Sequence, residues 1–321
     1  MRLCKPSFEI WNQEEGLEGI YKQIEKAGRI CYASDPIEGK AKTFVDRMIK
    51  LGHGAVLEHG TVYLQLNNTM SNTFPTTYKY EKNGYSAVVV YENKSDLSNR
   101  GIPYTTYNIT TNYRVLLQGD YETWDEAQAN NYDKNWLDDL QYLCELTEHH
   151  AKRVTVHFTT QIAITREYNR HRVNSMAEQS TRYCDYTDGK KFEGVGINLP
   201  DWITVQQVED SLVGRDIIAD DKWGTLYERE TYNWNAIDWW VWANQCCEVA
   251  YHKMIGLGWI PQQARTILPL DTNSELVHTA FISDWEHFFV LRDDKQHAHP
   301  DAYTLAHPLH EEFIKRGYVA I

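Results

Sequence analysis

The stretch RHRVNSMAEQSTRYCDY spans residues 170–186 and gathers basic and polar side chains in a chain whose formal net charge is −13. A helix expected just before it carries Arg166 and runs on into the stretch. Neighbouring side chains on a helix point about 100° apart, so Arg170, His171 and Arg172 would address different groups of one large ligand or of two adjacent ligands. The alternative is a solvated helix face with surface ion pairs.

The second half of the stretch has a different pattern. If it is extended, Glu178, Ser180 and Arg182 share one face, because side chains on a strand alternate between two faces. Arginine and serine can hold a phosphate through bidentate and hydroxyl hydrogen bonds, while a carboxylate can bind ribose hydroxyls or orient an arginine. This pattern favours a nucleotide monophosphate as the ligand.

The complete spacing is Arg-His-Arg, seven residues, Ser, and then Arg-Tyr two residues later, and it resembles the signature of the flavin-dependent thymidylate synthases. Further segments resemble that family in the family's order: GRICY (28–32), HGAVLEH (53–59), TTNYR (110–114), ARTILPL (264–270) and DWEHFFVLR (284–292). The resemblance covers nearly the whole chain.

The resemblance implies a methyltransferase that converts dUMP to dTMP. Methylenetetrahydrofolate would donate the carbon, and FADH2 regenerated by NADPH would reduce it to a methyl group. The protein would contribute orientation and electrostatics, with active sites between the subunits of a homotetramer. A second hypothesis is a nucleotide-binding sensor on the same fold without catalytic activity.

The resemblance also implies roles for individual residues. Arg292 is the predicted catalytic residue, because its fixed positive charge near the pyrimidine would favour the ionised ring. The predicted dUMP-binding residues are Glu167, Arg170, Glu178, Ser180, Thr181, Arg182, Arg265 and Arg292. The predicted FAD-binding residues are His53, Glu58, Arg170, His171, Arg172, Glu178 and His287. Cys184 is interpreted as a packed thiol, and Ser180 as a binding residue more than a nucleophile.

Four positions depart from the common pattern of the family. Phe281 and Ser283 stand where many members have Asn and Arg, Ala177 replaces a frequent Asn, and Ala55 replaces Ser or Thr. The first two substitutions affect expected flavin contacts. Our hypothesis is that two residues of the TTNYR segment, Asn112 and Arg114, compensate for them.

Arg292 also stands out from the residues alone. Trp285, Phe288, Phe289 and Arg292 lie at i, i+3, i+4 and i+7, so an arginine continues an aromatic stripe on one helical face. Burying an unpaired guanidinium is costly, so this one should meet a carboxylate, a carbonyl or a ligand.

Hydrophobic periodicity predicts the fold class: α/β (α+β), with a mostly antiparallel central sheet flanked by long helices. We expect one domain over residues 1–321, with an insertion at about 69–150. Two N-terminal helices are expected at 17–27, ended by Gly28, and at 41–51, ended by Gly52. A short helix at about 110–117, capped by Thr110 or Thr111, should precede a polar helical region at 124–150. Further helices are expected at 236–254, from Pro261, and from about Pro300, the last kinked or split at Pro308. Expected strands are 62–66, 88–90 and 154–158.

Composition excludes several classes of protein. The acidic balance argues against nucleic acid or an anionic membrane as partner, since both require clustered Lys and Arg. The six cysteines include no C-x-x-C pair and are interpreted as reduced thiols. The start lacks the apolar segment of a signal peptide, and the run 87–91 is too short to span a bilayer, so we expect a cytoplasmic protein.

A third hypothesis is a metal hydrolase that uses the histidine-rich C-terminal region. Its candidate ligands are His297, His299, His307 and His310 with Asp293, Asp294 or Asp301. The chain has no H-E-x-x-H or comparable helix motif, so we expect no metal.

Overall fold

The computed structural model describes residues 2–68, 74–93, 104–211, 213 and 234–320. Two predicted N-terminal helices are present and pack against each other, α1 (Gly16–Ile30) and α2 (Ala41–Lys50). Gly52, with φ 74°, follows α2 as predicted. Gly28 lies inside α1, which corrects the prediction that it ends the helix. A Cβ at this position would come within 2.7 Å of the Phe44 ring, so the glycine allows the two helices to approach closely.

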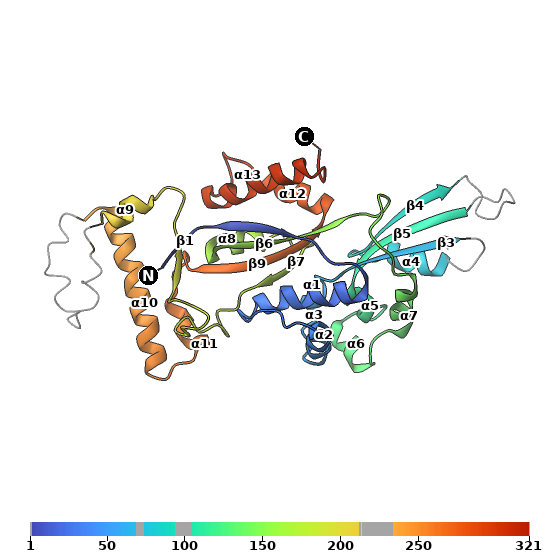
Figure 1. Cartoon of the computed structure of the whole chain (residues 1–321), viewed down its shortest axis with the longest axis horizontal. Coiled ribbons are helices and arrows are strands. Elements are labelled where there is room, and N and C mark those ends of the chain that lie inside the picture. Colours follow the sequence, from blue (N-terminus) through green and yellow to red (C-terminus); the bar gives the residue numbers. More distant parts are fainter. Residues whose placement is uncertain (1, 69–73, 94–103, 212, 214–233, 321) are drawn as a thin grey trace.

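The central sheet has four antiparallel strands in the order β2-β6-β9-β7. These are β2 (Ser7–Trp11), β6 (Arg153–Gln161), β9 (Asn273–Phe281) and β7 (Ser175–Glu178). Figure 1 shows α12 (Ile282–Arg292) and α13 (Pro300–Lys315) above this sheet and α1 below it. The side chains of β9 alternate accordingly: Leu276 joins the core under α12 and α13, while Val277 packs with Ala27 of α1.

A second sheet, antiparallel and three-stranded, lies at one end of the molecule in the order β3-β5-β4 (Figure 1). Its strands are β3 (Thr61–Asn68), β5 (Tyr104–Asn112) and β4 (Ala87–Asn93). With it lie α4 (Phe74–Glu81), α5 (Tyr113–Gln118), α6 (Trp124–Ala129), α7 (Lys134–Leu137) and the 3-10 helix η1 (Asp138–Tyr142). The short helix α3 (Gly54–Leu57) contacts α1, α2, α5 and β7 of the central sheet. The predicted strands 62–66 and 88–90 are therefore confirmed.

Two expectations for this region are corrected. Thr110 and Thr111 pair within β5, so they cannot cap α5; the cap is Asn112, whose side chain accepts from the Val115 amide at 3.1 Å. The polar region 124–150 forms short helices and loops instead of one helical element. The expected insertion at about 69–150 stays a prediction, and its start lies outside the described residues.

The remaining elements lie toward the other end of the molecule (Figure 1). They are β1 (Arg2–Cys4), β8 (Gly196–Asn198), α9 (Val205–Glu209), α10 (Ala236–Gly256), α11 (Pro261–Ala264) and the 3-10 helix η5 (Arg265–Ile267). β1 and β8 form a parallel pair. Helix α10 confirms the predicted long helix, and α13 runs unbroken through Pro308, which corrects the expected split. The predicted fold class is confirmed: helices surround sheets that are mostly antiparallel.

Candidate functional site

The three basic residues at the start of the 170–186 stretch lie in a turn, which corrects the helix expected there. Helix α8 (Ile162–Tyr168) ends before them, and β7 begins at Ser175. The His171 amide donates to the Tyr168 carbonyl at 3.2 Å, and the Asn174 amide donates to the His171 carbonyl at 3.2 Å. The chain must reverse here because β7 pairs antiparallel with β9. As a result the side chains of Arg170 and Arg172 are exposed while that of His171 is buried.

The second half of the stretch also turns. Strand β7 ends at Glu178, and the Tyr183 and Cys184 amides donate to the Ser180 carbonyl at 3.1 and 3.0 Å. The prediction that Glu178, Ser180 and Arg182 share one strand face is therefore wrong. The Ser180 amide donates to the Cys31 carbonyl at 3.1 Å, which holds this turn against the end of α1.

A cavity of about 470 Å³ opens beside this turn, and we call it the Ser180 cavity. Its polar lining comes from three parts of the chain: Arg166 of α8, the segment Glu178–Thr181, and Arg265 of η5. Four predicted dUMP-binding residues, Glu178, Ser180, Thr181 and Arg265, thus meet in one place. Arg166 was not among the predicted site residues, although its part in the local excess of basic residues was a signal for it.

Hydrogen bonds fix the acceptors and hydroxyls of the Ser180 cavity. The Glu178 carboxylate accepts from the Thr165 hydroxyl at 2.6 Å and from the Asn169 amide at 3.0 Å. The Arg265 guanidinium donates to the Thr181 hydroxyl at 3.3 Å. Arg265 is otherwise exposed, as is Arg166. Two exposed guanidinium groups beside two hydroxyls can bind a phosphate, because arginine offers paired donors to its oxygens.

A second cavity, of about 590 Å³, lies next to the other half of the stretch, and we call it the Arg292 cavity. Its lining includes Arg170, His171, Arg172, His287 and Arg292. Four predicted FAD-binding residues and the predicted catalytic residue therefore surround one space.

Arg292 is held by three acceptors at the end of α12. Its guanidinium donates to the Glu167 carboxylate at 2.8 Å, to the Glu167 carbonyl at 2.6 Å and to Nε2 of His171 at 3.2 Å. Its side chain is only 11% exposed. The predicted aromatic face is confirmed, because Trp285, Phe288 and Phe289 are buried beneath it. The expected carboxylate and carbonyl partners of Arg292 both come from Glu167.

His171 is suited to this role because it is neutral. Burial lowers the pKa of His171 to about 4, with Arg292 and His287 adding to the effect. The neutral ring can therefore accept the Arg292 N–H through Nε2 and carry its own proton on Nδ1. A protonated ring would offer Arg292 no lone pair and would place two cations in contact.

Several predicted residues line neither cavity. Arg182 is exposed, with its guanidinium 5.3 Å from the Tyr183 ring centre. Glu167 is engaged with Arg292. His53 is exposed, with Nδ1 3.2 Å from the Tyr32 hydroxyl. Within one chain, the predicted flavin contacts are thus spread over separate places.

The two residues proposed to compensate in flavin binding have structural partners. Asn112 is buried and caps α5. The Arg114 guanidinium forms an ion pair with the Glu58 carboxylate. Arg114 therefore compensates part of the negative charge of Glu58, which is itself a predicted flavin contact.

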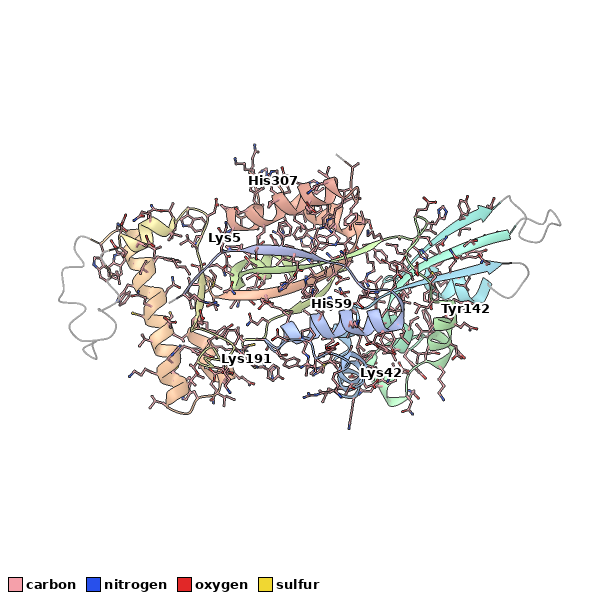
Figure 2. All side chains as sticks on the ribbon, in the orientation of Figure 1. Lys5, Lys42, His59, Tyr142, Lys191 and His307 are labelled. Atoms are coloured by element: carbon pink, nitrogen blue, oxygen red, sulfur yellow. The ribbon has the colours of Figure 1, made fainter. Side chains whose placement is uncertain are left out.

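The histidine-rich C-terminal region forms two groups, in which Asp293 contacts two histidines of α13 and Asp294 contacts His297. The Asp293 carboxylate lies 2.8 Å from Nδ1 of His307 and 2.7 Å from Nδ1 of His310, which joins the end of α12 to α13. Figure 2 shows His307 on α13, on the opposite side of the central sheet from His59. His297 pairs with Asp294 at 2.7 Å. Among the described residues, no three His, Cys, Asp or Glu side chains are grouped so that they could hold a metal ion.

No helix in the described part of the chain is long and apolar enough to cross a membrane.

Comparisons with known proteins place the chain in a family. The curated proteins give no match. Similar solved structures include a UMP/dUMP methylase, PolB from Streptomyces cacaoi, bound with 5-Br dUMP (14% identity, 98% of this chain and 93% of that chain covered, TM-score 0.40). The same protein bound with 5-Br UMP is similar over 98% of this chain and 91% of that chain, at 14% identity and a TM-score of 0.37.

The family model described as "Thymidylate synthase complementing protein" matches residues 106–316, well over half of the chain, and includes both cavities' arginines. The chain therefore belongs to the family of thymidylate synthase complementing proteins.

Proposed function

We propose that this protein is a thymidylate synthase that methylates C5 of dUMP, with methylenetetrahydrofolate as carbon donor and FADH2, regenerated by NADPH, as reductant. The observation that carries the proposal is the pair of arginine-lined cavities, one suited to a phosphate and the other built around Arg292. Family membership supports the reaction class.

The Ser180 cavity would hold the nucleotide by its phosphate. Arg166 and Arg265 supply positive charge in an acidic chain, and the hydroxyls of Ser180 and Thr181 add neutral donors. Glu178, already fixed by Thr165 and Asn169, would accept from ribose hydroxyls. This cavity thereby orients the nucleotide without any covalent bond to the protein.

Arg292 would act on the pyrimidine ring through its charge. A guanidinium near N3 and O4 favours the ionised ring and so raises the electron density at C5. Glu167 and His171 would hold the guanidinium in place before the substrate arrives, so little reorganisation is needed. Cys184 is a poor candidate for a nucleophile, because burial raises the pKa of its thiol.

The exposed Arg170, Arg172 and His287 of the Arg292 cavity fit the anionic part of a flavin dinucleotide. When bound, the flavin would supply the hydride chemistry. His53 and Glu58 line other surfaces of the same chain, so we propose that a homotetramer brings them to the site from a neighbouring subunit, as the family resemblance implies.

The first experiment is an absorbance spectrum of the purified chain with FAD, recorded with and without dUMP. The enzyme should be yellow and oxidise NADPH only when dUMP is present. A chain that binds dUMP but stays colourless after FAD is added would instead be a nucleotide sensor.

The second experiment tests the nucleotide cavity. Arg265→Ala should weaken dUMP binding at least about tenfold, the loss of a charge-assisted hydrogen bond, while FAD binding stays unchanged. Arg316→Ala is the matched control, because this arginine bonds to Glu312 and lines neither cavity. Equal dUMP affinity in the two variants would refute the assignment of the Ser180 cavity.

A further inference from the structure

A small cavity of about 250 Å³ lies at the C-terminal end of α1 and shares no lining residue with the Ser180 or the Arg292 cavity. We call it the Arg47 cavity. Three cations from separate parts of the chain line it: Arg29 of α1, Arg47 of α2, and Lys191 of the segment between β7 and β8. Figure 2 shows Lys191 below the central sheet, toward the end of α1.

The positive charge of this cavity stands out against the rest of the chain. Asp and Glu outnumber Lys and Arg by 45 to 32 in the whole sequence, yet none of the described residues that line the Arg47 cavity is acidic. A concave surface lined by one sign of charge concentrates ions of the opposite sign. The lining therefore indicates a site for an anion.

Two of the three cations have no counter-ion. Arg47 and Lys191 are exposed, and neither forms an ion pair with any residue that the structure describes. Arg29 differs, because its guanidinium donates to the Glu25 carboxylate at 2.9 and 3.1 Å, and Glu25 is only 2% exposed. The fold thus accounts for Arg29, whereas holding Arg47 and Lys191 at one small cavity brings only repulsion unless an anion joins them.

Two hydroxyl groups complete the donor set. Tyr32 and Ser34 line the cavity, and Ala33 between them has φ 44°, a conformation that L side chains rarely adopt. The Ser34 amide donates to the Arg29 carbonyl at 3.1 Å, which holds this turn against the end of α1. Burial raises the pKa of the Tyr32 hydroxyl, so it keeps its proton. Both hydroxyls can therefore donate to an anion that the cations attract.

The floor of the cavity is apolar. Phe44 is 7% exposed and Met48 is 2% exposed, and the Arg29 guanidinium lies 4.9 Å from the Phe44 ring centre. Apolar groups beneath the cations lower the local dielectric constant, which strengthens their attraction for an anion. The cavity is smaller than the pockets of about 300–1,000 Å³ that hold whole small molecules, so it suits one charged group whose carrier lies outside.

The donor set fits a phosphate better than a carboxylate. A carboxylate offers two oxygens in one plane and a single negative charge. A phosphomonoester offers three terminal oxygens that point in different directions and a charge of about −1.5 to −2. The two uncompensated cations match this charge, and the hydroxyls of a separate turn can reach oxygens that the cations leave free.

We propose that the Arg47 cavity binds the terminal phosphate of a phosphomonoester, with Arg47 and Lys191 pairing with its charge and with Tyr32 and Ser34 donating to its oxygens. Two sources share this chemistry. One is the 2′-phosphate of NADPH, because the Tyr32 hydroxyl lies 3.2 Å from Nδ1 of His53, a predicted flavin contact. The other is a free nucleotide that binds apart from the substrate. The first source rests on the proposed function, and the phosphate site itself does not.

The test compares the dissociation constants of 2′-AMP and adenosine for the full chain, with FAD and dUMP at saturating concentrations. Adenosine lacks the phosphate and should bind at least about tenfold more weakly. Arg47→Ala and Lys191→Ala should each weaken 2′-AMP binding about five- to tenfold and leave adenosine unchanged, while Arg47→Lys should keep most of the affinity. Arg29 is left intact because it neutralises the buried Glu25.

Two lysines serve as matched controls. Lys50 is exposed on the same helix as Arg47, and Lys190 is exposed next to Lys191; neither lines any of the three cavities. Lys50→Ala and Lys190→Ala should therefore bind 2′-AMP as the wild type does. Equal 2′-AMP affinity in Arg47→Ala and Lys50→Ala, or adenosine bound as tightly as 2′-AMP, would overturn the site and leave a group of solvated surface cations.

Steady-state kinetics distinguish the two sources. If the reductant supplies the phosphate, Arg47→Ala should raise the KM for NADPH about tenfold and leave that for NADH unchanged. If a free nucleotide supplies it, both KM values should stay unchanged although 2′-AMP binding is weakened. A chain that shows the Arg47 effect on 2′-AMP but no dUMP-dependent oxidation of NADPH would overturn the proposed function and leave the phosphate site supported.

Discussion

His171 should make the stability of the protein depend on pH in a predictable direction. The pKa of His171 is lowered to about 4 in the folded chain, first by burial and then by Arg292 and His287. In the unfolded chain the ordinary value is about 6.5. Between these values the unfolded chain binds the proton and the folded chain does not, so stability is complete above pH 6.5 and falls as the pH is lowered toward 4.

The size of the effect follows from the same two pKa values. At pH 5 this difference in proton binding lowers the free energy of unfolding by about 2 kcal/mol. Solvent in the adjoining Arg292 cavity should reduce that loss to about 1–2 kcal/mol. Urea unfolding at pH 8, 7, 6 and 5 measures it, with His171→Asn as the test variant, because asparagine keeps an acceptor for Arg292 without a titrating ring. The variant should lose this part of the pH dependence.

A second variant separates burial, the largest cause of the shift, from the charge of Arg292. Arg292→Gln removes the facing cation but leaves the burial, so it should keep most of the pH dependence and lose a smaller part. Burial also lowers the pKa values of His59 and His278; His59 contributes the same background in every variant, whereas part of the shift at His278 comes from His171 and is lost in His171→Asn. Parallel pH profiles for the wild type and His171→Asn would show that the ring is not held neutral against Arg292.

Further outcomes are expected for variants at Arg292, Arg182, Asn112 and Arg114. Arg292→Ala should keep the fold and much of the bound flavin but lose turnover, measured as dUMP-dependent NADPH oxidation; Arg292→Lys should not restore it, because one ammonium cannot reproduce the planar fork of donors. Arg182 lies outside the Ser180 cavity of its own chain, so Arg182→Lys should weaken dUMP binding, measured by calorimetry, only if a neighbouring subunit brings this guanidinium to the nucleotide; unchanged affinity would contradict that role. The double variant Asn112→Ala, Arg114→Ala should lose flavin if these residues compensate for Phe281 and Ser283, so full flavin content would reject that hypothesis. Asn112→Ala alone should lower the free energy of unfolding by about 1 kcal/mol, measured by urea unfolding, because the helix cap is lost.

Local periodicity predicted the features that depend on a single element. The aromatic face that leads to Arg292 is visible in the sequence because residues at i, i+3, i+4 and i+7 share a side of any helix. Features set by strand pairing could not be predicted in this way. Arg170 to Arg172 lie in a turn because β7 must pair with β9, a partner about a hundred residues away.

The difference between local patterns and contacts between distant elements also explains which parts of the candidate site could be predicted from the sequence. The run to Arg182 indicated a phosphate site, but only the fold shows that Arg166 and Arg265 meet there while Arg182 lies outside the cavity. The contacts of Glu167 and His171 with Arg292 depend on how α8 and the turn after it lie against the end of α12. A sequence pattern lists such residues without showing which of them touch one another.

The contact between the turn at Ser180 and the end of α1 determines which substitutions this part of the chain tolerates. The Ser180 amide donates to the Cys31 carbonyl, so the contact joins main chain to main chain. Replacing the Cys31 side chain with serine or alanine leaves both partner atoms in place, so the turn should stay bonded to the end of α1 in such variants. Proline at position 180 is the exception, since it removes the N–H and would release the turn from α1.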